Sequence, residues 1–396
     1  MTDEITVALI GIGGYGNHYA NAMVDAKPDQ RVRLLAAADP SPASCRRLED
    51  LKKLAPLYKS AAEIFESHKP DLTVIASPPH LHAPQICMAL QHGSAVMCEK
   101  PICTIPADAR KILNARLLAG RDVAIGYQWS FSDAVQQLKG DILAGRLGAP
   151  KRLRNISLWP RDEAYYGRSP WAGAQTDRDG NPIFDSPVAN GCAHHLHNML
   201  YVLGAQVDRS ARVVSAQAEL YRANPIENYD TAAIRYRTDA GVELLFYATH
   251  ATDERQGPVY DYEFEKAVVH YDDSPEAHMT VKFADGSEKD YGCPHEARDR
   301  KFWLSVDALR HGKPTVCGIE ASSVHTLCVA AAAESCPDIA TFDAAMIRYV
   351  GDPGHRISSV IGLADAFRQA YQAGKLPSEM GLPWAKVGKT VAVPDL

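Results

Sequence analysis

The sequence predicts an α/β protein of two domains, the first with a doubly wound parallel sheet and the second with a mostly antiparallel sheet. Three observations lead to this prediction. The chain has 396 residues, which suits two cores of ordinary size better than one. Short β-branched runs alternate with helical stretches up to about residue 128. Beyond about residue 150, strand-like segments follow one another with hairpin signals between them.

The first domain is expected over residues 1–128. Each expected strand is a short apolar run that stops at glycine, proline or an acidic residue. Because crossovers between parallel strands are right-handed, all carboxyl ends of these strands should meet at one edge of the sheet. The expected strands cover residues 5–10, 32–38, 72–76, 95–98 and 122–126, and helices are expected over 15–26, 84–91 and 106–118.

The second domain is expected over residues 129–396, with an extension that begins at about residue 337. A long stretch rich in Gly, Pro and Asp, residues 170–187, predicts a functional loop. The extension should contain one helix, over 358–373, and then an irregular end. The other expected strands are 151–159, 213–222, 231–238, 242–249, 260–270 and 279–284, with helices over 198–203, 301–310 and 322–333.

Composition excludes several classes of protein. Hydrophobic residues make up 46% of the chain and the net charge is −6, so neither nucleic acid nor an anionic membrane is expected as a partner. The N-terminus, MTDEITVALI, lacks the features of a secretory signal, and no run reaches transmembrane length. Nine cysteines without a CxxC pair indicate reduced thiols. We therefore expect a cytoplasmic protein.

The segment GIGGYG, residues 11–16, matches the G-x-G-x-x-G pattern directly after an expected strand. The first glycine allows a tight turn, the second lets the backbone approach a pyrophosphate, and the third lets the helix pack close to the strand. The helix N-terminus then offers N–H groups to phosphates. A simple glycine turn is the alternative. The segment predicts these cofactor-binding residues: Gly11, Ile12, Gly13, Gly14, Tyr15 and Gly16.

Asp39 ends the second expected strand, where an acid can accept hydrogen bonds from the adenosine ribose. This favours NAD over NADP. An ordinary turn residue before Pro40 is the alternative. Arg46 and Arg47 follow in the sequence and could serve a 2′-phosphate, so NADP is not excluded.

Two more strand ends carry candidate residues. Ser77 and Pro78 end the third strand and stiffen the edge where a cofactor would lie, and His82 either shapes that site or caps the next helix. Glu99 and Lys100 end the fourth strand and are expected to bind the cofactor at this edge of the sheet. The ammonium of Lys100 is suited to stabilise an alkoxide as a C–H bond gives up hydride. A cis bond to Pro101 would aim the lysine, although most X-Pro bonds are trans, and an exposed salt-bridging loop is the alternative.

These motifs, in this order, resemble those of the Gfo/Idh/MocA family of oxidoreductases, named after glucose–fructose oxidoreductase and inositol dehydrogenase. The resemblance continues through Gly126-Tyr127-Gln128 to Gly204. It implies a Rossmann domain followed by an α/β domain with a large open, mostly antiparallel sheet. That sheet is often the interface of a homodimer or homotetramer in the family. It also implies that Gln128 binds the cofactor and that the substrate is a sugar, cyclitol or related polyol.

Three histidines stand in GCAHHLHNML, residues 191–200. The resemblance places the family's catalytic histidine, which takes the proton of the reacting hydroxyl, at His194. It places the family's first Asp at Asn190, which brings no charge, and its second at His197. Two ligands three residues apart could begin a metal site, but the strong zinc pattern has a glutamate between histidines four apart. Core packing is the other alternative, and no metal is assigned.

Aromatic and arginine residues around the long loop form a candidate substrate wall. Aromatic faces stack on sugar rings, and guanidinium groups bind hydroxyls or carboxylates. A dimer contact rich in aromatic residues is the alternative. The full set of expected substrate-binding residues is Lys100, Trp159, Arg161, Tyr165, Arg168, Trp171, Asn190, His194 and His197.

We therefore expect an NAD(P)-dependent oxidoreductase that acts on a sugar, cyclitol or related polyol, with Lys100 and His194 as catalytic residues. Two other hypotheses remain open. Some relatives keep NAD bound and cleave glycosides by transient oxidation and elimination. The fold also serves as a non-enzymatic sensor of the cofactor.

Overall fold

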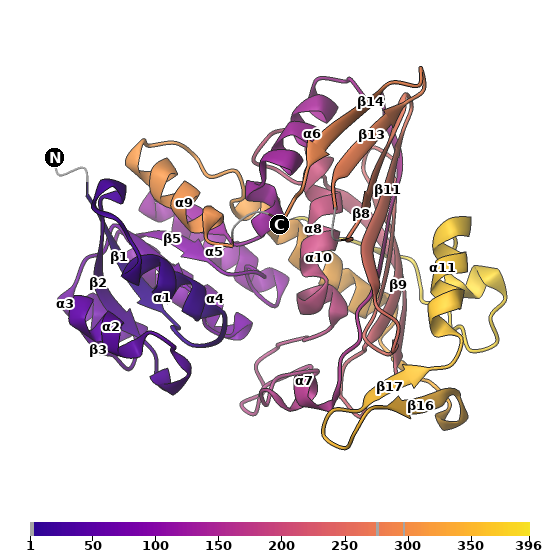
Figure 1. Cartoon of the computed structure of the whole chain (residues 1–396), viewed down its shortest axis with the longest axis horizontal. Coiled ribbons are helices and arrows are strands. Elements are labelled where there is room, and N and C mark those ends of the chain that lie inside the picture. The colour runs from indigo at the N-terminus through magenta and orange to yellow at the C-terminus, as the bar shows by residue number, and fades with distance from the viewer. Residues whose placement is uncertain (1–3, 275–276, 296–297) are drawn as a thin grey trace. The chain divides into compact units, whose positions relative to one another are not determined.

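The computed structural model describes residues 4–274, 277–295 and 298–396 (Figure 1). The chain forms two compact units. Unit 1 comprises Met1–Phe131 together with His295–Ser323, and unit 2 comprises Ser132–Pro294 together with Val324–Leu396. The first unit is therefore discontinuous in sequence, which a single division after residue 128 does not anticipate.

Unit 1 contains a sheet of six parallel strands in the order β3-β2-β1-β4-β5-β6. The central strands are buried apolar runs, as expected of a sheet covered by helices on both faces. Because β1 lies between β2 and β4, the order in which strands are added to the sheet reverses at β1. Ligands of such sheets bind at this point, outside the carboxyl ends of the strands. The strands are β1 (Ile5–Ile10), β2 (Val32–Ala38), β3 (Leu57–Tyr58), β4 (Leu72–Ile75), β5 (Ala95–Cys98) and β6 (Val123–Ile125).

The helices of unit 1 follow the strands as the alternation predicts. A 3-10 turn, η1, covers the end of the glycine segment and leads into α1. The expected N- and C-terminal signals are present in α5, which begins at Pro106 and ends before Gly120 at φ +60°. The helices are α1 (Asn17–Val24), α2 (Leu48–Leu54), α3 (Ala61–Ser67), α4 (His82–Gln91), α5 (Pro106–Ala119) and α9 (Arg300–Arg310), and the 3-10 turns include η1 (Gly14–Gly16), η3 (Pro42–Ser44), η4 (Pro79–Leu81) and η5 (Gln128–Phe131).

Unit 2 contains a ten-stranded sheet in the order β14-β13-β12-β11-β7-β10-β9-β8-β15, with β18 also paired to β8. Most pairs are antiparallel, but β7 pairs with β10, and β8 with β15, in parallel. The strands are β7 (Pro150–Leu158), β8 (Val213–Arg222), β9 (Thr231–Thr238), β10 (Glu243–Thr249), β11 (Gln256–Phe264), β12 (Ala267–Asp272), β13 (Met279–Phe283), β14 (Glu288–Gly292), β15 (Ala340–Thr341) and β18 (Val391–Ala392). The predicted fold class is confirmed for both sheets.

Helices cover both faces of this large sheet (Figure 1). On one face, Phe367 of α11 packs in a core with Ile156 and Leu245. On the other, the Tyr236 hydroxyl donates a hydrogen bond to Cys328 of α10. The helices of this region are α6 (Asp133–Leu143), α7 (Glu163–Gly167), the π-helix η6 (Pro187–Gly191), α8 (Ala193–Val202), α10 (Ile319–Ser335), α11 (Leu363–Ala373) and the turns η7 (Ala344–Met346) and η8 (Pro377–Met380).

Two predicted elements are wrong. Residues 260–270 form a hairpin of β11 and β12, because Glu265 and Lys266 are both exposed and break the alternation of buried and exposed positions. Residues 358–373 are not one helix. Their first part is β17 (Ile357–Val360), paired with β16 (Ile347–Val350), and α11 begins only after Gly362 at φ +77°. Within the described residues, no helix combines the length and apolar character needed to cross a membrane.

Candidate active site

The glycine segment forms a turn that only glycine permits at two positions. Gly11 has φ +80°, and a Cβ there would lie 2.9 Å from the Ala76 carbonyl carbon. A Cβ on Gly16 would lie 2.1 Å from the Gly11 oxygen, so helix α1 approaches the strand as closely as the motif requires. Gly14, at φ +50°, faces open space. A tight turn with open space above it, directly before a helix N-terminus, fits a pyrophosphate.

Asp39 holds this turn against the end of β2. One carboxylate oxygen accepts hydrogen bonds from the backbone N–H groups of Ile12 (3.0 Å) and Gly13 (3.3 Å), and the other from Ser41 (2.8 Å). A Cβ on Gly13 would lie 2.1 Å from the Ser44 hydroxyl. Glycine is therefore needed at this position because of Ser44, whether or not a cofactor is bound. Asp39 thus has a structural role that the sequence analysis gave only as an alternative, and contact with a ribose stays a prediction.

His82 links the ends of β4 and β5. It is the first residue of α4, and its ring nitrogens lie 2.7 Å from the Pro101 carbonyl and 2.8 Å from the Ser77 carbonyl. Burial lowers the pKa of this imidazole. The Lys100–Pro101 peptide is cis. The Ser77 hydroxyl, just before the turn that Pro78 begins, donates to the Gln85 side chain of α4 (2.6 Å). His82 therefore ties the backbone that follows β4 to the backbone that follows β5, next to Lys100.

Glu99 forms a buried ion pair that the sequence analysis missed. The Lys301 ammonium lies 2.5 Å from its carboxylate, and the two side chains are 1% and 9% exposed. Tyr19 also donates a hydrogen bond to Glu99, and Lys301 donates to the Gly126 carbonyl (3.2 Å). Burial alone lowers the pKa of Lys301, but the Glu99 carboxylate and Tyr15 raise it overall. Lys301 therefore keeps its charge, and the alternative of an exposed salt-bridging loop is wrong for Glu99, which is buried.

Tyr15 connects this pair to the glycine turn. Its ring centre lies 4.5 Å from the Lys301 ammonium, which also donates a hydrogen bond to the Tyr15 hydroxyl (3.2 Å). That hydroxyl in turn lies 3.5 Å from the Gln128 side-chain oxygen. Residues from the glycine turn, the end of β5, the segment after β6 and helix α9 therefore converge. The sequence analysis did not use the one available signal for Lys301, a lysine beside Phe302 on the buried face of an amphipathic helix.

The predicted substrate wall comes together within unit 2. The Arg161 guanidinium carbon lies 5.7 Å from the Trp159 ring centre and 4.8 Å from that of Tyr165. Arg168 lies 3.7 Å from the Tyr165 ring and 5.0 Å from the Trp171 ring. Helix α7 positions Tyr165. These contacts make one cluster of stacked aromatic and guanidinium groups, and its role in binding stays a prediction.

The histidine segment spans the first turns of α8, which begins at Ala193, five residues before the helix predicted from the sequence. His194 lies in the first turn. His195 contacts the substrate wall, with its ring centre 5.1 Å from that of Trp159. His197 instead stacks on Tyr201, at 5.6 Å, in a buried part of the helix. His195, which the sequence analysis did not assign to the site, thus contacts the wall.

Asn190 donates a hydrogen bond to the buried carboxylate of Asp185 (2.9 Å). The same carboxylate accepts from the Gly173 N–H group (2.7 Å) and lies 3.6 Å from the Arg168 guanidinium. A negative charge is therefore present beside Asn190, although Asn190 itself carries none. Across the described ranges, no three His, Cys, Asp or Glu side chains form a group that could hold a metal ion.

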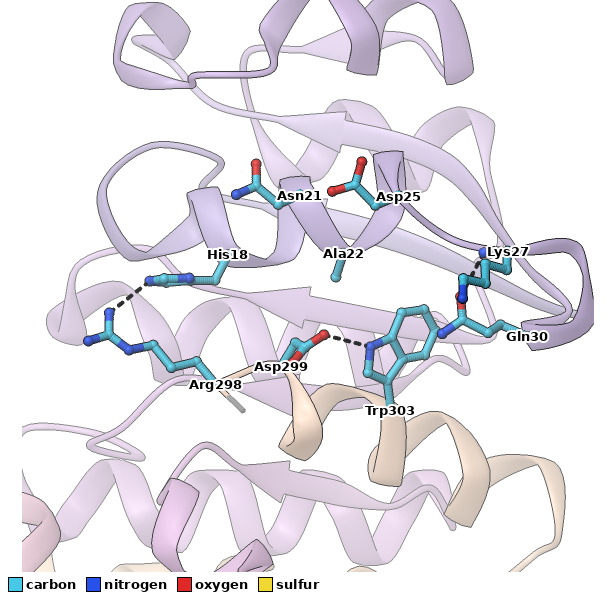
Figure 2. A pocket seen from close by; sticks show the side chains of 9 residues that line it. All are labelled: His18, Asn21, Ala22, Asp25, Lys27, Gln30, Arg298, Asp299 and Trp303. Carbon is cyan, nitrogen blue, oxygen red and sulfur yellow. Dashed lines mark hydrogen bonds between the residues drawn. The ribbon is translucent and has the colours of Figure 1, made fainter. Parts of the chain in front are cut away.

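A separate groove of about 320 Å³ lies between α1 and the start of α9 (Figure 2). Arg298 lies 3.3 Å from the His18 ring nitrogen, and the Trp303 indole donates to Asp299 (2.9 Å). None of the residues predicted to bind cofactor or substrate lines this groove. The lining residues are His18, Asn21, Ala22, Asp25, Lys27, Gln30, Arg298, Asp299 and Trp303.

A parallel sheet with this glycine turn and an acidic second strand end defines an NAD-binding domain of the Rossmann class. Residues 5–127 match the model of the Gfo/Idh/MocA family, described as an oxidoreductase family with an NAD-binding Rossmann fold. This part of the chain is similar to that family.

Several similar proteins are named as dehydrogenases. Inositol 2-dehydrogenase of Rubrobacter xylanophilus is 30% identical over 41% of this chain and 45% of its own length. D-Glucoside 3-dehydrogenase of Escherichia coli is 25% identical over 54% and 59%. The matches thus span about half the length of these relatives. Among solved structures, levoglucosan dehydrogenase in complex with NADH aligns with a TM-score of 0.71 at 16% identity, covering 85% of this chain and 98% of that one. This last likeness shows the shared fold.

Proposed function

We propose that the protein is an NAD(P)-dependent oxidoreductase acting on a hydroxyl-bearing carbon of a sugar, cyclitol or related polyol. The observation that carries this proposal is the convergence, at the carboxyl edge of one parallel sheet, of the glycine turn, Gln128 and the buried Glu99–Lys301 pair. Lys100 follows that pair directly in the chain. Relatives named as cyclitol and glucoside dehydrogenases support the same class of substrate.

The nicotinamide of the bound cofactor supplies the acceptor or donor of hydride. Lys100 stabilises the negative charge that develops on the substrate oxygen, because an ammonium in a water-poor site is a strong partner for an alkoxide. His194 exchanges the proton of the reacting hydroxyl, which suits an imidazole whose unperturbed pKa is near neutral pH. Glu99 keeps the segment before Lys100 in place through its ion pair with Lys301.

We further propose a preference for NAD over NADP. Asp39 brings a carboxylate to the end of β2, where a 2′-phosphate would meet like charge. Arg47, one of the two arginines that could offset this, already binds Asp50 (2.8 Å) and Asp25 (3.1 Å). We also propose a homodimer or homotetramer formed through the large sheet, which light scattering on the full chain would test.

The decisive experiment is reduction of NAD⁺ and NADP⁺ against a panel of sugars, cyclitols and glycosides. We expect turnover with at least one polyol, and loss of about three orders of magnitude in kcat for Lys100→Met with cofactor affinity retained. Release of an aglycone without net cofactor reduction would instead identify a glycosidase. Tight cofactor binding without turnover on any member of the panel would identify a sensor.

A further inference from the structure

His250 and Arg161 meet at the ends of two adjacent strands of unit 2. Strands β7 and β10 pair in parallel, so the residues that follow them emerge at the same edge of the sheet. Backbone pairing continues past both strands, from the Trp159 N–H group to Thr249 (2.9 Å) and from the Arg161 N–H group to His250 (3.2 Å). Backbone hydrogen bonds therefore hold Arg161 and His250 next to each other.

The hydrogen-bond pattern fixes the tautomer of His250. Its Nδ1 lies 2.8 Å from the Trp159 carbonyl oxygen, which can only accept, so Nδ1 carries the hydrogen. Burial, followed by the charge of Arg161, lowers the pKa of this imidazole to about 3, so the ring is neutral at physiological pH. Nε2 therefore presents a lone pair.

This lone pair has no protein donor. His250 is 2% exposed, and its Nε2 lacks a hydrogen-bond partner among the residues that the structure describes. A Cβ on Gly191, three residues before His194, would lie 2.7 Å from this nitrogen, so only glycine leaves room there for the ring. A buried acceptor without a donor is costly unless a ligand or water supplies one.

Arg161 shows the complementary feature. Its guanidinium stacks on Tyr165 and donates to the Pro160 carbonyl (3.1 Å), and its buried Nε lacks a hydrogen-bond partner in the described ranges. In those ranges, no carboxylate lies within 4.0 Å of it, whereas neighbouring Arg168 has Asp185 at 3.6 Å. The buried hydroxyls of Tyr166 and Ser169 also lack partners there.

We propose that this cluster is a subsite for a polyol that carries a carboxylate, that is, a sugar acid. The Arg161 guanidinium binds the carboxylate, and the Nε2 atom of His250 accepts a hydrogen bond from a neighbouring hydroxyl. One uncompensated guanidinium matches one negative charge, and its planar fork matches a carboxylate. The chemical role of this ligand as substrate rests on the proposed function, but its binding does not.

Calorimetric titration of the full-length protein, with and without NAD⁺, tests the subsite. The probes are D-gluconate and D-glucuronate, with D-glucose as the neutral analogue and D-glucose 6-phosphate as the dianionic one. We expect at least one acid to bind about tenfold tighter than both glucose and the phosphate. Arg161→Met should weaken binding of that acid by about 10- to 100-fold and change the affinity for glucose less than about twofold.

His250→Asn keeps a donor for the Trp159 carbonyl and removes the Nε2 acceptor, so it should weaken binding of acid and neutral sugar alike by about two- to tenfold. Arg212→Met and His270→Asn are matched controls, because both side chains are exposed and lie outside the cluster. They should leave all affinities unchanged. If Arg161→Met does not fold, Arg161→Lys keeps the charge without the fork and should weaken acid binding by a smaller factor.

Equal affinity for acids and glucose, tighter binding of the phosphate, or unchanged acid affinity in both Arg161 variants would overturn the proposal. The outcome is separable from that of the proposed function. Acid binding by a protein that turns over no member of the substrate panel would leave the subsite standing and refute the oxidoreductase. Turnover of neutral polyols that does not change in the Arg161 variants, without preferential binding of acids, would support the oxidoreductase and refute the subsite.

Discussion

The Lys301 ammonium and the Glu99 carboxylate lie 2.5 Å apart in the interior of unit 1, although 202 positions separate them in the sequence. The pair contacts Tyr15 of the glycine turn and the Gly126 carbonyl, so it joins the ends of three strands and a helix that arrives late in the chain. Buried pairs of this kind contribute little net stability, but breaking one leaves an uncompensated charge.

Lys301→Met should therefore destabilise the protein by about 3–5 kcal/mol, because the Glu99 carboxylate stays buried without a cation. Urea unfolding gives the free energy. Lys111→Met, which removes the ion pair of an exposed lysine with Asp108, should change stability far less, because solvent screens such a pair. Adding Glu99→Gln to Lys301→Met should recover part of the loss. A stability for Lys301→Met equal to that of the Lys111 control would show that the pair is not needed.

Gly16→Ala should weaken both folding and cofactor binding, because its Cβ would overlap the Gly11 carbonyl oxygen. Gly14→Ala is the matched control. It meets no atom within 4 Å and costs only the strain of φ +50°, about 1 kcal/mol. We expect Gly16→Ala to lose at least twice as much unfolding free energy as Gly14→Ala, measured by urea titration. Equal losses would mean that the helix does not depend on this close approach.

Asp39→Asn should raise the affinity for NADP⁺ relative to NAD⁺ by about tenfold, because it removes the negative charge at the end of β2. The amide oxygen can still accept the hydrogen bonds from Ile12 and Gly13, so the turn should remain intact. Asp39→Ala removes those acceptors as well and should also lower stability. Fluorescence titration with both nucleotides provides the readout, and an unchanged ratio in both variants would exclude a role for Asp39 in cofactor choice.

Asn190→Asp should be unfavourable even though it introduces the residue that the family resemblance implies. The new carboxylate would lie within hydrogen-bond distance of Asp185, and two carboxylates at that distance cannot both ionise without cost. We expect a loss of about 1–3 kcal/mol at neutral pH that diminishes as the pH falls below the raised pKa. The double variant Asp185→Asn/Asn190→Asp again has one carboxylate at this contact. It should be more stable than Asn190→Asp alone.

His250 and His270 should give pH dependences of opposite sign. The pKa of His250 is lowered to about 3, so between pH 3 and its ordinary value near 6.5 the unfolded chain binds the extra proton. Its contribution to stability therefore falls as the pH falls through that window, by at most about 1.4 kcal/mol per unit. The hydrogen bond to Asp261 raises the pKa of His270, so its contribution is full below about 6.5 and is lost as the pH rises through the folded pKa.

The difference between wild type and His250→Asn, or between wild type and His270→Asn, isolates each slope in urea unfolding from pH 4 to 8. Identical curves for wild type and His250→Asn would show that His250 is solvated in the folded protein.

The sequence predicted the parallel sheet closely because its signals are local. Residues 5–10, 32–38 and 95–98 match β1, β2 and β5 at both ends, since each is an apolar run stopped by glycine, proline or charge. The hairpin at Glu265 and Lys266 was missed because its turn carries no glycine. Its signal was instead two successive exposed positions in an alternating pattern.

The candidate site was less predictable because its determining contacts are not local. The pattern around residue 99 identifies Glu99 and Lys100 as residues at a strand end, but nothing near them indicates that helix α9 supplies Lys301. His250 was likewise missed, because one histidine at the end of a strand looks like a core residue. Only the parallel pairing of β7 with β10 brings it next to Arg161.

The discontinuity of unit 1 affects the order in which the protein is made. When residue 131 leaves the ribosome, every residue matched by the family model has been synthesised, but the cation that neutralises Glu99 has not. At ordinary elongation rates, Lys301 follows on the order of ten seconds later or more. Unit 1 therefore cannot be completed until residues 295–323 are synthesised, after most of unit 2. A chimaera that borrows only residues 1–131 would inherit that unfinished state permanently.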